Sequence, residues 1–219
     1  MLVDGARTLD ELIFAHAAGR LPPAVHLLVD AHLQLAPASR DLHARYEELG
    51  GVLFEQIEPE AVSRDLFDRL QRRLDGEATR SDVAAPHACD GADGLPVALW
   101  PLVPQGLDAL PWRRFRHVAQ VEFPGFADDG LRLGMVALKA GRGVPRHTHE
   151  GPELTLVLRG AFVDARDRYG RGDVAIADPS VDHRPIATPE EDCLCLTVTA
   201  GAIRLTGPLG RLLDPFVRL

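Results

Sequence analysis

The first third of the chain carries apolar residues at helical rather than alternating spacing. Thr8 and Glu11 have the spacing of a capping box, which predicts a helix through about Ala18, with Gly19 ending it. Two prolines at 22–23 suit the first turn of a second helix. The apolar face of this second helix recurs at helical spacing and consists of Val25, Leu28, Val29, His32 and Leu35.

Two further helices are predicted before residue 75. Ser39 follows Pro37 and can cap a third helix, whose apolar positions are Leu42, Tyr46, Leu49, Leu53 and Phe54. Residues 60–74 form a fourth, amphipathic segment with an apolar stripe at Val62, Leu66, Phe67, Leu70 and Leu74. The opposite face carries the charges of Arg64, Asp68, Arg72 and Arg73. Packing of the stripe on the protein's own core is the favoured interpretation, and a grip on a partner is the alternative.

From residue 95 the pattern changes to short runs of β-forming residues separated by Gly, Pro and Asp. These runs are residues 116–123, 131–139, 154–158, 162–166, 174–177 and 193–199. Their spacing predicts an antiparallel sandwich or barrel, and a short helix is expected at 206–213. Residues 75–94 are rich in Gly, Ala, Asp and Ser, as is typical of a linker. We therefore predict a mainly β protein with an α-helical N-terminal domain at 1–74, a linker at 75–94 and a β domain at 95–219.

Composition and charge narrow the classes of function. The 219 residues have 46% apolar content and a net charge of −8, which argues against direct nucleic-acid binding through a basic surface. No apolar run reaches the length of a membrane span, and the first ten residues lack a secretory signal core. Cys89, Cys193 and Cys195 do not make a disulfide framework, so we expect a cytoplasmic protein. Cys193 and Cys195 alternate on a strand and are expected to point inward as inert thiols.

The strongest chemical signal is a set of metal-binding side chains between residues 141 and 183. His147 and His149 are two apart, so on a strand both point to the same face, and Glu153 can return beside them after a short turn. A second segment, from Gly172 to His183, supplies a third imidazole. Three imidazoles and a carboxylate suit Zn²⁺, Fe²⁺, Mn²⁺ or Ni²⁺. We expect one divalent ion per chain, zinc in first place, bound through His147, His149, Glu153 and His183.

The spacing G-x5-H-x-H-x3-E-x6-G, from Gly141 to Gly160, resembles the first sequence motif of the cupin family at every fixed position. The second cupin motif is matched less well. Gly172 and His183 are in place, but different residues stand at three of its positions, namely Asp178, Ser180 and Ala187. The resemblance implies that the β domain is a C-terminal cupin, an RmlC-like jelly-roll β-barrel with the metal inside.

The whole chain also resembles the ChrR family of zinc-dependent anti-sigma factors, in which a helical anti-sigma domain precedes a cupin. The segments that carry this resemblance are residues 17–22, 153–158, 160–162, 169–174 and 207–216. The resemblance implies that the helical domain clasps an extracytoplasmic-function-type sigma factor. It also implies that the cupin senses a stress signal or a ligand, and that the protein regulates transcription.

The helical half departs from the family at its zinc site. Zinc anti-sigma domains carry H-x3-C-x2-C, and His32 matches the histidine, whereas Ala36 and Ser39 stand at the two cysteine positions. His16 and His26 are too scattered to replace two thiolates, which give structural zinc much of its affinity. We therefore predict no zinc in the helical domain and interpret His32 as a polar residue at a helix edge.

The sequence leaves two other functions open. A cupin with three histidines and a glutamate could be a metal-dependent, dioxygenase-like enzyme acting on a small carbonyl compound. No general base is evident beyond the ligands, so no catalytic residue is assigned, and Arg146, Glu150 and Tyr169 are interpreted as turn or rim residues. The remaining alternative is a metal-stabilised module that holds a small ligand in the barrel.

Overall fold

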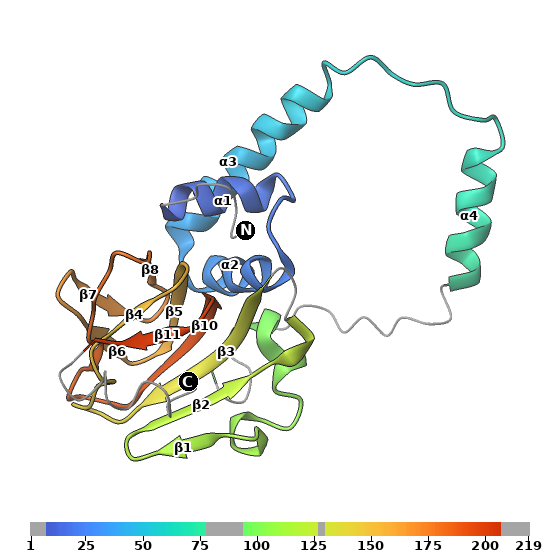
Figure 1. Ribbon diagram of the computed structural model, residues 1–219. Helices are drawn as coiled ribbons and strands as arrows, with labels where there is room; N and C mark the ends of the chain where they lie inside the picture. The colour runs from blue at the N-terminus through green and yellow to red at the C-terminus, as the bar shows by residue number, and fades with distance from the viewer. Residues whose placement is uncertain (1–7, 78–93, 127–129, 207–219) are drawn as a thin grey trace.

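A computed structural model describes residues 8–77, 94–126 and 130–206, which form a helical region followed by a β-barrel (Figure 1). Cys89 and, beyond Thr206, the helix predicted at 206–213 lie outside the described residues. Among the helices described, none combines the length and the apolar character needed to cross a membrane.

The helical region contains α1 (Leu9–Ala17), α2 (Pro23–Leu35), α3 (Pro37–Phe54) and α4 (Leu66–Glu77). The predicted capping box is confirmed, because the Glu11 N–H donates to Thr8 Oγ1 at 3.3 Å and the Thr8 N–H donates to Glu11 Oε2 at 3.0 Å. Gly19 follows α1 with φ of +64°, the left-handed conformation that commonly ends a helix. The start and end of α1, and the start of α2 at Pro23, therefore lie where local sequence signals place them.

Two predicted helix starts are wrong. α3 begins at Pro37 rather than at a capping Ser39, because the fixed φ of proline suits the first helical position. α4 begins at Leu66 rather than near residue 60, so Val62 precedes the helix. Ser63 lies just before this start, and serine favours positions that lead into a helix. The fourth helix is therefore shorter than its apolar stripe suggested.

After residue 94 the described chain contains eleven strands. They are β1 (Arg113–Phe115), β2 (Val118–Glu122), β3 (Leu131–Leu138), β4 (His147–His149), β5 (Glu153–Arg159), β6 (Ala161–Val163), β7 (Arg168–Gly170), β8 (Val174–Ala177), β9 (Ile186–Ala187), β10 (Cys193–Ala200) and β11 (Ile203–Leu205). Short 3₁₀ helices lie at η1 (Val97–Leu102), η2 (Leu107–Ala109) and η3 (Pro124–Phe126). The predicted strand 116–123 is shorter at its start, because Arg116 adopts φ of +51° in the turn between β1 and β2.

The strands form one large sheet and two small ones (Figure 1). The large sheet has the order β1-β2-β3-β10-β5-β8, and the small sheets have the orders β11-β4 and β7-β6-β9. Every strand pair is antiparallel, and β10 lies between β3 and β5 although it comes late in the chain. The antiparallel β architecture predicted from the sequence is therefore confirmed.

The strand β10 is buried on both of its faces. Leu196 and Val198 pack outward into a core that also contains Leu28 and Val29 of α2. α2 lies against the ends of β3 and β10 in Figure 1, and it contacts both strands. The helical region and the barrel thus share one core, while the boundaries at 74 and 95 stay a prediction.

The other face of β10 lines the barrel interior. Cys193 and Cys195 pack there with Val157 and Phe162 in a second apolar cluster. The Sγ atoms of the two cysteines are 3.6 Å apart and both residues are buried, which confirms that they share an inward face. The first four residues of β10 are buried on both sides, and they form a continuous apolar run rather than an alternation.

Candidate metal centre

The short strand β4 presents His147 and His149 to the barrel interior. The two residues flank Thr148, so both imidazoles point to one face of the strand, and both are buried. The backbone of His147 exchanges two hydrogen bonds of 3.0 Å with the backbone of His183. This bridge carries the loop before β9 to the side of β4 and places the third imidazole next to the pair.

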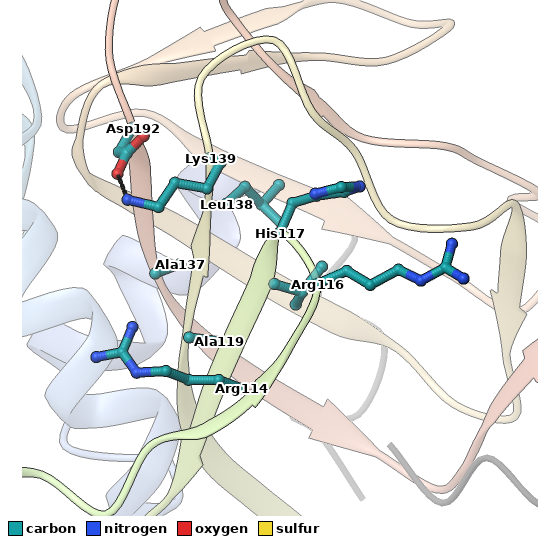
Figure 2. A pocket seen from close by; sticks show the side chains of 9 residues that line it. Arg114, Arg116, His117, Ala119, Ala137, Leu138, Lys139 and Asp192 are labelled. Atoms are coloured by element: carbon teal, nitrogen blue, oxygen red, sulfur yellow. Dashed lines mark hydrogen bonds and ion pairs between the residues drawn. The ribbon is translucent and has the colours of Figure 1, made fainter.

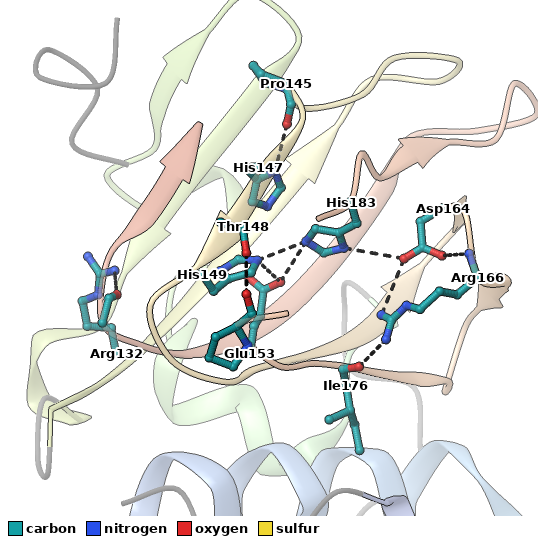
Figure 3. A network of polar contacts seen from close by, with 12 residues as sticks. Arg132, Pro145, His147, Thr148, His149, Glu153, Asp164, Arg166, Ile176 and His183 are labelled. Atoms are coloured by element: carbon teal, nitrogen blue, oxygen red, sulfur yellow. Dashed lines mark hydrogen bonds and ion pairs between the residues drawn. The ribbon is translucent and has the colours of Figure 1, made fainter. Parts of the chain in front are cut away.

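Glu153 opens β5 and completes the group (Figure 3). Its Oε2 lies 3.2 Å from His149 Nε2 and 3.8 Å from His183 Nε2, and the two imidazole nitrogens are 3.0 Å apart. One ligand atom of each residue, including His147, lies within 4.8 Å of the others. An ion with bonds of about 2.0–2.1 Å in tetrahedral geometry separates its ligand atoms by about 3.4 Å. This buried group could therefore bind a metal ion.

Two of the three histidines, His147 and His183, face a partner on the far side of the ring. His147 Nδ1 lies 2.8 Å from the Pro145 carbonyl, which can only accept, so Nδ1 carries the proton and Nε2 is free to bind. His183 Nδ1 faces Asp164 Oδ2 at 3.5 Å, and these two atoms lack a closer hydrogen-bonding partner among the described residues. Carboxylates in this position are typical of histidine metal ligands, whose orientation they fix.

The groups around Asp164 favour its ionised form, although its side chain is fully buried. Burial acts to raise the pKa of this carboxyl, but the backbone N–H groups of Arg166 and Asp167 and the Arg166 guanidinium outweigh it and leave the pKa below its ordinary value. Asp164 is therefore an anion beside His183. Sequence reasoning missed Asp164, because this residue lies between the two cupin motifs, in the turn that joins β6 and β7.

Burial also keeps the imidazoles of His147 and His183 neutral. Desolvation lowers the pKa of His147 to about 4 and lowers the pKa of His183 below its ordinary value. Neutral imidazole is the form that binds a metal, since the protonated ring has no lone pair to offer. At neutral pH the group thus offers at least two unprotonated nitrogens together with a carboxylate.

The substituted second motif still makes a turn in front of His183. Asp178 Oδ1 accepts the Ser180 N–H at 2.7 Å, so a side chain closes the turn that proline and glycine would otherwise favour. Arg146 pairs with Asp182 at 3.2 Å on the exposed rim, as expected for a residue outside the group. The two unusual residues therefore leave the position of the third histidine intact.

A separate hollow lies at the edge of the large sheet (Figure 2). It is lined by Arg114, Arg116, His117, Val118, Ala119, Ala137, Leu138, Lys139 and Asp192. Lys139 Nζ donates to Asp192 Oδ2 at 2.7 Å across it, which neutralises one of its cations. None of these nine residues belongs to the histidine group, so this hollow is not an entrance to the metal centre.

His32 does not lie at a helix edge, which corrects the interpretation from sequence. It is buried, its Nδ1–H donates to the Gly172 carbonyl of the barrel at 2.7 Å, and its Nε2 lies 2.8 Å from Ser39 Oγ. The residue that matches the zinc-site histidine thus joins α2 to the barrel. Ser39, at a cysteine position of the zinc motif, is its hydrogen-bonding partner.

A β-barrel that buries the two histidines and the glutamate of the motif G-x5-H-x-H-x3-E-x6-G together with a third histidine, His183, is a cupin. The ChrR cupin-like domain family matches residues 106–202. Anti-sigma-E factor ChrR of Cereibacter sphaeroides is 36% identical over 212 residues, which are 96% of this chain and 96% of that protein. The crystal structure of Rhodobacter sphaeroides SigE in complex with the anti-sigma ChrR matches with a TM-score of 0.71 and 33% identity, over 88% of this chain and 97% of that chain. The chain belongs to the ChrR family of anti-sigma factors.

Proposed function

We propose that this protein is a cytoplasmic anti-sigma factor that binds an extracytoplasmic-function-type sigma factor through its helical region and thereby regulates transcription. The observation that carries the proposal is an apolar surface on α3 and α4. The related ChrR is described in complex with a sigma factor, SigE, and the likeness to it spans both the helical region and the barrel.

The apolar surface consists of large side chains that the fold leaves in solvent. On α4, Phe67, Leu70 and Leu74 are 73%, 51% and 67% exposed. The second half of α3 and the segment after it add Leu49, Val52, Leu53, Phe54 and Ile57, all of them exposed. The favoured interpretation that the α4 stripe packs on the protein's own core is therefore wrong. Exposed apolar patches of this kind mark protein interaction sites, which supports the alternative of a grip on a partner.

The arrangement of α3 and α4 also fits the binding of a partner protein. Figure 1 shows α4 standing apart from the barrel and from α1–α3, at the end of the segment that leaves α3. On α4 the three apolar residues recur at positions i, i+3 and i+7, so they form one face of the helix. An amphipathic helix that lays such a face into a groove is a common mode of protein recognition. The domain division at 1–74, 75–94 and 95–219 is part of this proposal, in which α3 and α4 meet the partner while α2 stays packed on the barrel.

The barrel's part in the proposal is one divalent metal ion, zinc in first place. The ligands would be His147, His149, Glu153 and His183, because three imidazoles and a carboxylate suit zinc. Such an ion would hold β4, β5 and the loop before β9 together and would make the barrel responsive to a signal that displaces or oxidises the site. No observation among the described residues favours the dioxygenase-like alternative. The experiment below would still detect such an activity.

Co-expression tests the proposal directly. The full chain is produced with each extracytoplasmic-function-type sigma factor of its own genome, and complexes are separated by size-exclusion chromatography. One sigma factor is expected to elute with the chain in equimolar amounts and to lose transcription activity in vitro. If none of them binds, the proposed function is wrong. Elemental analysis of the same sample measures the metal, and metal-dependent oxygen uptake with small carbonyl compounds would favour an enzyme instead.

A further inference from the structure

A second group of metal-ligating side chains lies among the first three helices, away from the barrel. α1 contributes His16, α2 contributes His26 and Asp30, and α3 contributes His43. His16 and His26 are scattered in the sequence, but the helix packing brings both of them to the Asp30 carboxylate. One ligand atom each from His16, His26 and Asp30 lies within 4.8 Å of the others.

The spacing of the two imidazoles about the Asp30 carboxylate suits a bound ion. His16 Nε2 lies 2.9 Å from Asp30 Oδ1, and His26 Nε2 lies 3.4 Å from Asp30 Oδ2. These distances are close to the roughly 3.4 Å between neighbouring ligands of a tetrahedral zinc ion. The rings of His16 and His26 stack with centroids 4.2 Å apart and planes 18° from parallel. Both Nε2 atoms face the Asp30 carboxylate.

A chain of contacts continues from His16 into α3. His16 Nδ1 lies 2.8 Å from His43 Nε2, and His43 Nδ1 lies 3.4 Å from Glu47 Oε2. A metal-ligating histidine usually donates its second N–H to a neighbouring acceptor, and this hydrogen bond fixes the ring and raises its basicity. His43 is therefore placed to orient His16 rather than to bind the ion itself.

A cation between Asp30 and His16 is compatible with the contacts that lead into α3. Both residues then act as electron-pair donors, and the Nδ1–H of His16 donates to His43 Nε2. The Nδ1–H of His43 is left to face Glu47 Oε2 at 3.4 Å.

The carboxylate is charged and reachable from solvent. Burial acts to raise the pKa of Asp30, but the hydrogen bond with His16 and the charges of the nearby imidazoles outweigh it and hold the pKa below its ordinary value. The side chains of His26 and Asp30 are 44% and 37% exposed, whereas that of His16 is 8% exposed. Water can therefore complete the coordination of an ion from the outer side, and the ion can exchange.

We propose that His16, His26 and Asp30 bind a divalent transition-metal ion, zinc in first place, with His43 as a positioning residue. The ion links α1 to α2, and the contact between His16 and His43 extends this link to α3. A helical unit of this size has a small core, and a bound metal ion stabilises such a unit. This ligand set contains no thiolate and uses none of the positions of the H-x3-C-x2-C motif. It therefore revises the prediction of a zinc-free helical domain without restoring the family motif.

Zinc stoichiometry of the full chain tests the proposal. Wild type, His26→Gln and Asp30→Asn are stripped with a chelator, titrated with zinc alone and desalted, and the zinc retained per chain is measured by mass spectrometry. Both variants change half-exposed side chains, so circular dichroism is expected to show an intact fold. Wild type is expected to retain one more zinc ion per chain than either variant. The matched control, His117→Gln, changes an exposed histidine outside the cluster and is expected to retain as much as wild type.

The other outcomes overturn the proposal. Equal stoichiometry in wild type, His26→Gln and Asp30→Asn means that the cluster holds no metal ion. Because the barrel ligands are the same in all four proteins, failure of the barrel site lowers every value equally and leaves the difference readable. For the positioning role, His43→Leu is expected to weaken zinc binding at the cluster by about 10- to 100-fold, while His43→Gln keeps an acceptor and restores most of the affinity. Equal affinities for these two variants remove that role from His43.

Discussion

Replacing Phe67, Leu70 and Leu74 together by alanine is expected to weaken sigma-factor binding by about 30- to 700-fold. The three residues form the apolar face of α4 and lie largely in solvent in the free protein. A partner that covers α4 would remove this surface from water. Alanine keeps the helix, because it has the highest helix propensity, so the substitution removes the apolar contacts and little else.

The magnitude follows from the exposed fractions. Full burial of a Phe or Leu side chain contributes about 1.5–3 kcal/mol, and the three residues still have 73%, 51% and 67% of their surface to bury. Scaled by these fractions, the three side chains contribute about 3–6 kcal/mol on binding. Alanine retains about a third of that, which leaves a loss of about 2–4 kcal/mol. Each 1.4 kcal/mol corresponds to a tenfold change in Kd.

The assay is a titration of the cognate sigma factor by calorimetry or interferometry, with circular dichroism to check helix content. The matched control is Asp68→Ala with Arg72→Ala, two charged residues on the opposite face of α4. The control is expected to change Kd by less than about fivefold, since exposed charges contribute about 1 kcal/mol at most. A triple variant that binds as tightly as wild type would refute the placement of the partner on α4.

Three further predictions concern the barrel and its junction with α2. Asp164→Asn is expected to weaken zinc binding by about 10- to 100-fold, because the charged acceptor facing His183 is lost, and an unchanged affinity against a competing chelator removes Asp164 from the centre. His32→Leu leaves the buried Gly172 carbonyl without its donor, so the free energy of unfolding in urea should fall by about 1–3 kcal/mol, and an unchanged midpoint contradicts the contact. The metal-free protein should lose stability as the pH falls from 6.5 toward about 4, because the folded state keeps His147 neutral while the unfolded chain takes up a proton. That lowered pKa corresponds to a full loss of about 3 kcal/mol, and a melting temperature that is constant over this pH window would falsify the assignment.

Local signals in the sequence were sufficient to predict most of the elements. The capping box at Thr8 and the alternation of His147 and His149 involve residues within one turn or one strand, so their geometry follows from backbone periodicity. The lengths of α3 and α4 were less predictable, because Pro37 and Ser63 compete with other start signals nearby. Element identity was thus easier to predict than element boundaries.

Contacts between distant segments could not be read from the same patterns. Asp164 reaches His183 only because the barrel closes, and His16 meets Asp30 only because α1 packs against α2. His32 was placed by its helical position alone, which does not reveal that the barrel supplies an acceptor in Gly172. Each of these pairings depends on tertiary packing, and a single sequence carries no periodic signal for it.

The metal ligands and the helical region are joined through one strand of the barrel. Glu153 opens β5 and faces the interior, whereas Leu154 and Leu156 of the same strand face the core that contains α2. The Gly172 N–H donates to the β5 carbonyl of Val157 at 2.8 Å, and the Gly172 carbonyl accepts from His32 of α2. An ion that fixes Glu153 therefore also fixes a strand whose other face lines the core that contains α2.

This connection makes a reciprocal prediction. If zinc in the barrel changes the affinity of the helices for the sigma factor by some factor, the sigma factor must change the zinc affinity by the same factor. Zinc binding to the His26→Gln variant, which isolates the barrel site, is measured by chelator competition with and without the sigma factor. A coupling of about 1–3 kcal/mol, typical of linked sites, appears as a 5- to 150-fold difference. Identical zinc affinities in the two conditions show that β5 transmits nothing to the helices, and the barrel then acts only as a scaffold.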